Sequence, residues 1–242
     1  MNSIYSNIQN AILKGEKLLA VLLDPEKFPV GDTSCFINKV NKSIATHIFI
    51  GGSTVEADTT EVIVTEIKKN TNLPIVLFPG DVTQITNTAD ALLFLSLISG
   101  RNPEYLIGKH VESISKLKNT PLEIISTGYI LIENGKETAV ERVTNTKPLS
   151  RNDTLNIVNT AKAGELLGMK LIYLEAGSGA SVPITKEIIR LVKKEIQIPL
   201  IVGGGIRSVK QLEEAYNSGA DLVVIGTAFE DDESFFDELK NN

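Results

Sequence analysis

Eight short apolar runs, rich in β-branched residues, recur along the chain, and helical spacing follows most of them. Eight strands that alternate with helices predict a parallel sheet, since each parallel pair of strands needs a crossover connection. The runs are almost continuously apolar, which indicates that both faces of the sheet are covered. The expected strands are 18–24, 47–53, 74–80, 91–97, 123–128, 170–177, 198–205 and 222–228.

Eight such units in 242 residues predict a TIM barrel that forms a single domain over residues 1–242. The main alternative is a flavodoxin-like or Rossmann sheet, which is disfavoured because no G-x-G-x-x-G motif follows the first expected strand. Residues 81–90, between the third and fourth strands, are too few for a helix of average length. We therefore expect a short or missing helix at this point of the barrel.

A polar segment, residues 133–153, separates the fifth and sixth expected strands. In a barrel such an excursion follows the carboxyl end of a strand, on the face that carries active sites, so it is expected to overhang that face as a lid or rim. A solvated loop without a role is an equally open alternative.

Charge and composition restrict the partners and the compartment. The 24 basic and 30 acidic side chains give a net charge of -6, and no basic run indicates a nucleic-acid partner. No stretch approaches the roughly 18 apolar residues of a membrane span, and the first residues do not resemble a signal peptide. The single cysteine, Cys35, cannot form an internal disulfide. We therefore expect a cytoplasmic protein without an integral membrane segment.

Glu175 ends the sixth apolar run and precedes a loop of small residues that reaches Gly179. A lone carboxylate is costly to bury inside a strand, so Glu175 is expected at the strand mouth, where its charge is solvated or used. Taken alone, the pattern fits equally well a strand that happens to end on an acid. The two histidines, His47 and His110, are expected to be structural, because one opens an apolar strand and the other lies in a helical segment.

Glycines follow the last two expected strands, as Gly203-Gly204-Gly205 and as Gly226-Thr227. Loops after strands seven and eight commonly bind phosphate in TIM barrels, because unhindered backbone N–H groups point at the anion. Three consecutive glycines weaken a strand, so a purely structural origin would cost stability. The pattern predicts a phosphate site but does not identify a reaction.

Asp24 ends the first expected strand, and Pro25 then directs the chain into an exit turn. Its carboxylate is well placed to hold a hard cation, although capping the next segment is an equally open role. Ser53 would supply a second oxygen from the neighbouring strand end. Two protein oxygens together with water and a diphosphate form a usual coordination shell for Mg²⁺.

Together these motifs resemble the geranylgeranylglyceryl phosphate synthase family, from Asp24 through the string YLEAGSG to Thr227. The family joins the 3-hydroxyl of sn-glycerol 1-phosphate to a polyprenyl diphosphate, forms an ether bond for lipid biosynthesis and releases diphosphate. The resemblance implies a Mg²⁺-dependent prenyltransferase, geranylgeranyl diphosphate as the expected donor, and a homo-oligomer, either a dimer or a hexamer. A metal-independent sugar-phosphate isomerase or lyase, or a non-catalytic protein that binds a phosphate metabolite, remain alternatives.

The resemblance also implies residue roles. Asp24 and Ser53 would bind Mg²⁺, and glycerol phosphate would be bound by Tyr173, Leu174, Glu175, Ala176, Gly177, Ser178, Gly179, Gly204, Gly205, Gly226 and Thr227. Glu175 is expected to accept the proton of the glycerol hydroxyl.

Charge around the diphosphate is less completely assigned. Lys27 and Arg101 are expected to contact the diphosphate. Leu22 stands where many family members carry a lysine, so any phosphate contact of that lysine must come from elsewhere or be absent.

Overall fold

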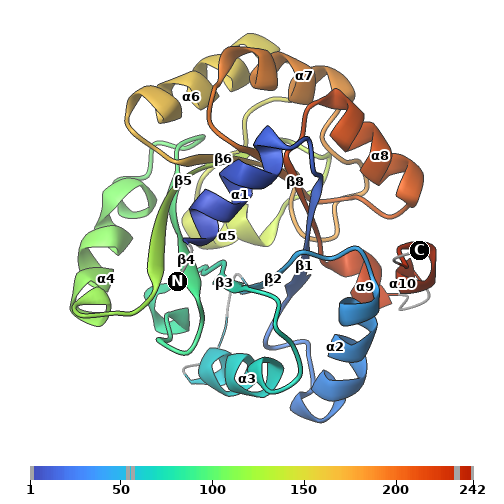
Figure 1. Ribbon diagram of the computed structural model, residues 1–242. Helices are drawn as coiled ribbons and strands as arrows, with labels where there is room; N and C mark the ends of the chain where they lie inside the picture. The colour runs from blue at the N-terminus through green and yellow to red at the C-terminus, as the bar shows by residue number, and fades with distance from the viewer. Residues whose placement is uncertain (1–2, 53–54, 56–57, 232–234, 241–242) are drawn as a thin grey trace.

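Eight parallel strands close into a barrel in the computed structural model, which describes residues 3–52, 55, 58–231 and 235–240 (Figure 1). Each strand pairs with the next along the chain, and the last pairs with the first, which confirms the predicted TIM barrel. The strands are β1 Leu18–Leu23, β2 His47–Ile50, β3 Ile75–Leu77, β4 Ala91–Leu97, β5 Glu123–Leu131, β6 Leu171–Glu175, β7 Leu200–Gly203 and β8 Leu222–Ile225.

Helices surround this barrel, and several begin at a side chain that caps the free backbone N–H groups of the first turn. Thr185 caps α7 through the Ile188 N–H, and Ser208 caps α8 through the Gln211 N–H. The helices are α1 Ile4–Leu13, α2 Thr33–Lys42, α3 Thr59–Lys68, α4 Lys109–Leu117, α5 Ala139–Thr144, α6 Thr154–Leu166, α7 Lys186–Glu195, α8 Val209–Ser218, α9 Thr227–Asp231 and α10 Phe235–Glu238. Within the described ranges, none is long and apolar enough to cross a lipid bilayer.

Apolar side chains form two layers, because successive residues of a strand point to opposite faces. The inner layer fills the barrel with Ala20, Phe49, Val76 and Tyr173, among others. The outer layer, which includes Leu174, packs the strands against the helices. Buried runs of this kind explain why the strands read as continuously apolar in the sequence.

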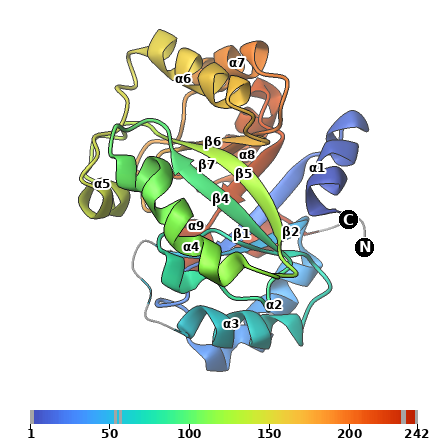
Figure 2. The same ribbon diagram turned by 90° about the vertical axis from the view of Figure 1, so that its left-hand side faces the viewer.

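The barrel has two differently built ends, which carry α1 and α5 (Figure 2). The apolar face of α1 packs into the inner layer through Ile4, Ile8 and Ala11, so this helix plugs the amino-terminal end. At the opposite end, α5 lies within the 133–153 segment that follows β5. The helical ring is also interrupted. A 3₁₀ turn, η2 (Val82–Gln84), connects β3 to β4, which confirms the predicted loss of a full helix.

Candidate active site

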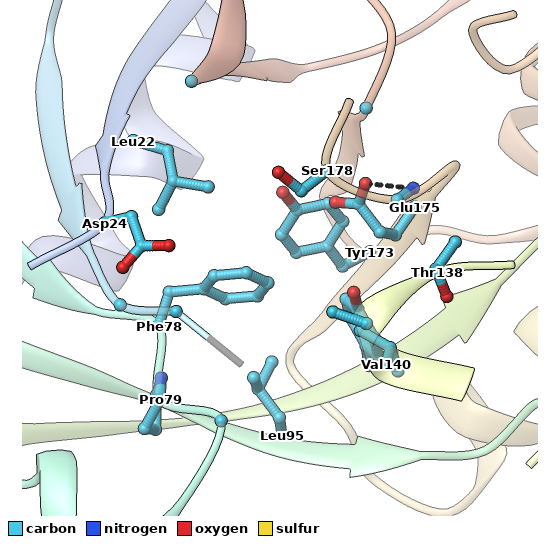
Figure 3. Close-up of a pocket in the computed structure, with 18 of the residues that line it drawn as sticks. Leu22, Asp24, Phe78, Pro79, Leu95, Thr138, Val140, Tyr173, Glu175 and Ser178 are labelled. Carbon is cyan, nitrogen blue, oxygen red and sulfur yellow. Dashed lines mark hydrogen bonds between the residues drawn. The ribbon is translucent and has the colours of Figure 1, made fainter. Parts of the chain in front are cut away.

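A cavity of about 510 Å³ opens at the carboxyl end of the barrel (Figure 3). Residues from the ends of β1, β6, β7 and β8 line it, together with the loop after β3 and the rim helix α5. The cavity brings together residues far apart in sequence, because all parallel strands end on this face.

Glu175 lies in this cavity at the end of β6, but it is only 5% exposed. Its Oε1 accepts a hydrogen bond from the backbone N–H of Gly177 at 2.6 Å. Burial raises the pKa of Glu175 to about 7, although the Gly177 N–H and the neighbouring Tyr173 hydroxyl both act to lower it. The expected strand-mouth position is correct, and the carboxyl group is buried there rather than solvated. A carboxyl of this kind exchanges a proton readily near neutral pH.

The glycines at the end of β7 and just after it allow the backbone to approach this carboxyl group closely. A Cβ atom added to Gly204 would lie 2.4 Å from Glu175 Oε1, and one added to Gly203 would lie 2.4 Å from Tyr173 Oη. Gly204 also has a φ of 84°, in the left-handed region that disfavours other residues. These glycines are therefore required by the fit around Glu175, independently of any phosphate.

Three aromatic rings form an inner wall of the cavity. Tyr173 stacks on Phe78 with ring centroids 5.2 Å apart, and Tyr129 meets Tyr173 edge-on at 5.4 Å. The buried Tyr173 hydroxyl lies close enough to the Glu175 carboxyl to act on its pKa, but it makes no well-formed hydrogen bond among the described residues. Burial, with the negative charge of Glu175 as a second cause, raises the pKa of both tyrosines well above 10, so both hydroxyls stay protonated. A buried hydroxyl without a well-formed hydrogen bond destabilises the protein unless a ligand supplies that bond.

Asp24 faces Glu175 across the cavity (Figure 3). Its Oδ1 accepts a hydrogen bond from the Glu26 backbone N–H at 3.2 Å, and its Oδ2 lies 3.4 Å from Lys27 Nζ. Asp24 therefore both caps its turn and lines the cavity. Gly52 leaves space beside this carboxylate, because a Cβ atom there would lie 2.6 Å from Oδ1.

Gln84 holds the loop that carries Gly52. Its side-chain amide accepts from the Gly52 N–H at 3.3 Å and donates to the Gly52 carbonyl at 2.8 Å. The η2 turn that replaces a helix thus positions the backbone next to Asp24. The sequence signal for this role was absent, because a glutamine in a short polar connection is an ordinary loop residue.

The fit of Asp24 to a cation can be judged from its donor set. No cluster of three or more His, Cys, Asp or Glu side chains that would hold a metal occurs within the described part of the chain. Ser53, the other predicted ligand, lies outside the described residues. One carboxylate with free space beside it suits Mg²⁺, which keeps several waters and takes its other ligands from substrate phosphates.

The predicted glycerol phosphate residues mostly line the cavity. Gly179 donates its N–H to the Thr227 hydroxyl at 3.3 Å, which joins the loops after β6 and β8. Of the predicted set, the lining residues are Tyr173, Glu175, Gly177, Ser178, Gly179, Gly204, Gly205, Gly226 and Thr227.

Two members of that set do not line the cavity, and Arg101 does not either. The side chain of Leu174 points outward into the second apolar layer, as strand alternation requires. Ala176 is fully buried. Arg101 folds back on its own turn, where Nη1 donates to the carbonyls of Gly100 at 2.6 Å and Ile98 at 3.2 Å. The structure therefore does not place Arg101 at the cavity, and its predicted diphosphate contact stays a prediction.

Cationic side chains do line the cavity, at other positions. Lys27, the predicted diphosphate contact, is among them, whereas Lys109, Arg142 and Arg207 were not expected. Lys109 is held between Asp81 at 3.0 Å and Glu112 at 2.9 Å. Leu22, at the position where many family members carry a lysine, lines the cavity beside Gly226.

The two histidines occupy different environments. His47 is buried near the amino-terminal end, where desolvation lowers its pKa to about 4. His110 lines the cavity and packs edge-on against Phe94, with ring centroids 4.4 Å apart. Burial also lowers the pKa of His110.

The 133–153 segment forms a rim of the cavity, as predicted. Residues 137–140 and 142–144 line the cavity. A capping box fixes the start of α5: Thr138 Oγ1 accepts from the Glu141 N–H at 3.1 Å, and Glu141 Oε2 accepts from the Thr138 N–H at 2.8 Å. The rim is therefore an ordered element.

Comparisons with known proteins agree with these motifs. The PcrB family matches residues 10–242. The geranylgeranylglyceryl phosphate synthase of Flavobacterium johnsoniae is 54% identical, over 98% of this chain and 98% of its own length. That of Zunongwangia profunda is 56% identical, over 93% of this chain and 98% of its own.

A solved structure extends the similarity to three dimensions. (S)-3-O-geranylgeranylglyceryl phosphate synthase from Thermoplasma acidophilum, in complex with its substrate sn-glycerol-1-phosphate, has a TM-score of 0.92 and 28% identity to this chain. The match covers 99% of this chain and 96% of that one. The resemblance seen in the motifs is confirmed, and this chain belongs to the PcrB family, the family of geranylgeranylglyceryl phosphate synthases.

Proposed function

We propose that this protein is a prenyltransferase that joins the 3-hydroxyl of sn-glycerol 1-phosphate to a polyprenyl diphosphate and releases diphosphate. Geranylgeranyl diphosphate is the expected donor. The observation that carries the proposal is Glu175, a buried carboxyl with a pKa of about 7 that faces Asp24 across one cavity. The names of the similar synthases and the glycerol phosphate bound to the Thermoplasma acidophilum enzyme support the choice of substrates.

Glycerol phosphate would occupy the side of the cavity formed by the loops after β6, β7 and β8. Glycine-bearing loops there offer backbone N–H groups to the phosphate. The buried hydroxyl of Tyr173 makes no well-formed hydrogen bond among the described residues, and a glycerol hydroxyl would supply one. This placement directs the remaining glycerol hydroxyl toward Glu175.

Glu175 would act as the general base. As the glycerol oxygen bonds to the first prenyl carbon, the bond from that carbon to the diphosphate oxygen breaks. The glycerol hydroxyl proton passes to a carboxylate oxygen of Glu175, and the electron pair of the broken bond leaves with diphosphate. A base with a pKa near 7 is efficient at neutral pH, because a useful fraction is ionised and the proton is still held firmly.

The aromatic wall would favour the charge that develops during transfer. Positive charge grows on the prenyl carbon as its bond to diphosphate lengthens. The rings of Phe78, Tyr129 and Tyr173 line the cavity next to Glu175, and their electron-rich faces attract a cation. Because both tyrosine hydroxyls stay protonated, the wall itself adds no competing negative charge.

Diphosphate would bind on the opposite side, near β1. We propose that Asp24 holds Mg²⁺ there, and that Ser53 is its second ligand. Mg²⁺ bound at this position would neutralise the negative charge that collects on the departing diphosphate. Lys27, which lies beside Asp24 and lines the cavity, is placed to bind a diphosphate oxygen.

The hydrocarbon chain would follow the apolar part of the cavity. This part extends along the gap in the helical ring, where Pro79, Val82, Ile85, Phe94 and Leu95 line it. An amphiphilic donor therefore meets charge at Asp24 and apolar surface beyond it. A small sugar phosphate would leave that surface uncovered.

A defined assay tests the proposed function. Purified protein is incubated with sn-glycerol 1-phosphate, Mg²⁺ and prenyl diphosphates of increasing length, and released diphosphate and the ether product are measured. We expect both products in equal amounts, and loss of both on chelation. Absence of diphosphate release with every donor would contradict the proposal, and turnover of a sugar phosphate that survives chelation would support the isomerase alternative.

We also propose that the protein is a cytoplasmic homo-oligomer, either a dimer or a hexamer. Ile107, Val111 and Ile114 recur at helical spacing before and along α4, and each is more than half exposed. An exposed apolar strip of this kind is typical of association surfaces. Light scattering coupled to size-exclusion chromatography would measure the state, and a mass of one chain would contradict the proposal.

A further inference from the structure

Asn134 connects the rim of the cavity to the loop that follows Glu175. It lies just after β5 and is 6% exposed. Its side-chain Nδ2 donates a hydrogen bond to the carbonyl of Ala176, and its Oδ1 accepts one from the Lys136 N–H at 3.0 Å. Only the amide oxygen can accept from Lys136, so the NH₂ group is oriented toward Ala176.

The peptide unit that Asn134 binds is the unit that binds Glu175. The carbonyl of Ala176 and the N–H of Gly177 belong to one peptide bond, and that N–H donates to Glu175 Oε1 at 2.6 Å. A peptide unit is planar, so fixing the direction of its carbonyl fixes the direction of its N–H. Donation to the carbonyl also polarises the N–H and strengthens its bond to the carboxylate.

The backbone at this point needs such support. Gly177 has a φ of 101°, a backbone conformation that most residues avoid. A glycine can adopt this conformation, but it can adopt many others as well, so glycine alone does not fix it. The rim packs directly on it, since an added Cβ atom would lie 2.5 Å from Thr138 Cγ2. Asn134 and Thr138 therefore both contact the Ala176–Gly177 peptide unit, from the side on which α5 lies.

We propose that Asn134 is a positioning residue for Glu175: by holding the Ala176–Gly177 peptide unit, it keeps the Gly177 N–H directed at the carboxylate that accepts the substrate proton. The proposal rests on the function proposed above, because it is Glu175 as general base that the contact serves. It also gives the 133–153 segment a role in the chemistry beyond enclosing the cavity.

Loss of the Asn134 donor should change the pKa of Glu175 in a definite direction. The Gly177 N–H lowers the pKa of Glu175 and burial raises it. If the peptide unit turns away, the carboxylate loses this donor and its pKa rises above about 7. Tyr129 and Tyr173 stay protonated throughout, and the nearby Glu141 is engaged in its capping box. Other charged or titratable side chains that line the cavity are Asp24, Glu26, Lys27, Asp81, Tyr105, Lys109, His110, Glu137, Arg142 and Arg207.

The direct test is the titration of Glu175 in the free protein. Carboxyl carbons of ¹³C-labelled glutamate are followed by NMR, and Glu175 is assigned from the signal lost in Glu175→Gln. We expect Asn134→Ala to move the titration midpoint of Glu175 up by about one unit. No shift in a folded Asn134→Ala protein would overturn the proposal. This readout needs no turnover, so a shifted midpoint without prenyl transfer would refute the proposed function and leave the positioning role standing.

The pH profile of kcat/KM gives the second readout. A rise of about one unit predicts roughly a fivefold loss at pH 7 that nearly vanishes at pH 9, because the base is then ionised in both proteins. A loss of equal size at every pH would mean that Asn134 is only structural, and would overturn the proposal.

A second substitution separates the lost donor from other effects. Asn134→Asp keeps an acceptor for the Lys136 N–H and removes the donor, so it should raise the midpoint at least as far as Asn134→Ala does. If the alanine variant fails to fold, an unshifted midpoint in Asn134→Asp would still overturn the proposal. A shift in Asn134→Asp together with none in Asn134→Ala would show that added charge alone acts, against the proposal. The matched control is Asn152→Asp, the same change at an exposed position of the same segment, which should shift nothing.

Discussion

A glutamate accepts backbone hydrogen bonds at each end of the barrel, with opposite results. At the amino-terminal end, Glu123 binds three donors of α1: the Ser3 hydroxyl at 2.5 Å, and the backbone N–H groups of Ile4 at 2.5 Å and Tyr5 at 3.2 Å. At the carboxyl end, Glu175 is more deeply buried and accepts one bond from a backbone N–H.

Burial and the number of hydrogen-bond donors both differ between these two carboxylates. Three donors, two of them from the first turn of a helix, compensate the charge of Glu123 and fix the plug to β5. Burial raises the proton affinity of Glu175, and the backbone donor from Gly177 offsets this only in part. The same side chain thus stabilises the fold at one end, and at the other is suited to take up a proton.

The largest expected effect is on catalysis. Glu175→Gln keeps the size of the side chain and removes the base, so kcat/KM should fall roughly 10²- to 10⁴-fold. Diphosphate release measures the loss, and circular dichroism checks the fold. Glu123→Gln is the matched control and should keep kcat/KM within about twofold. A loss smaller than about tenfold in Glu175→Gln would mean that another group accepts the proton.

The second effect is on stability at the plug. Glu123→Ala leaves three donors of α1 without their acceptor and should lower the free energy of unfolding by roughly 3 kcal/mol. Urea denaturation measures the change. Glu213→Ala, at an exposed position of α8, is the control and should stay within about 0.5 kcal/mol. If both variants unfold alike, α1 is not held by Glu123.

The third prediction concerns stability at the other end of the barrel, where replacing the glutamate should stabilise the protein. The pKa of Glu175 is about 7 when folded and near 4.5 when unfolded, so folding takes up a proton between these values. The free energy of unfolding therefore falls as pH rises from about 4.5 to about 7, and stays reduced above that. Glu175→Gln removes this cost and should be more stable at pH 8 by roughly 2 kcal/mol. A less stable variant would contradict the view that burial of ionised Glu175 destabilises the fold.

The smallest effect concerns His47, near the plug. Its pKa is about 4 when folded against about 6.5 when unfolded, so the unfolded state binds the proton first as pH falls. Stability due to neutral His47 is complete above about 6.5 and is lost towards about 4. Between pH 7 and 5.5 the loss should be about 1 kcal/mol, as measured by urea denaturation. His47→Asn should lack this dependence, and an unchanged slope would assign it to other groups.

The strands could be predicted because their signal is local. Runs buried on both faces are visible in the sequence, and each of the eight expected strands was found. Their ends were less predictable. The fifth strand was expected to stop at 128, but β5 continues to Leu131 because it pairs with β6 from Thr127 onward. Tyr129 lies in that extension, so a residue of the aromatic wall was missed.

Site residues could be predicted where their position at a strand end places them on one face of the barrel. They could not be predicted where the direction of a side chain depends on its packing. Glycine loops and strand-end acids must lie on one face of a barrel, so Asp24, Glu175 and Gly204 were found. The direction of Arg101 depends on which carbonyls lie nearest, and that of Asn134 depends on contacts across 42 residues. Neither is encoded in the local sequence. The metal role of Ser53 stays a prediction, since the residue lies outside the described ranges.

The 3₁₀ turn between β3 and β4 has a consequence for how such a barrel can diversify. With a full helix absent there, apolar side chains of the neighbouring elements border the cavity. Changes in their size would reshape the room for a hydrocarbon chain without disturbing any hydrogen bond of the sheet. On the function proposed above, one chemistry could therefore serve donors of different length, and selection could act on the two properties separately.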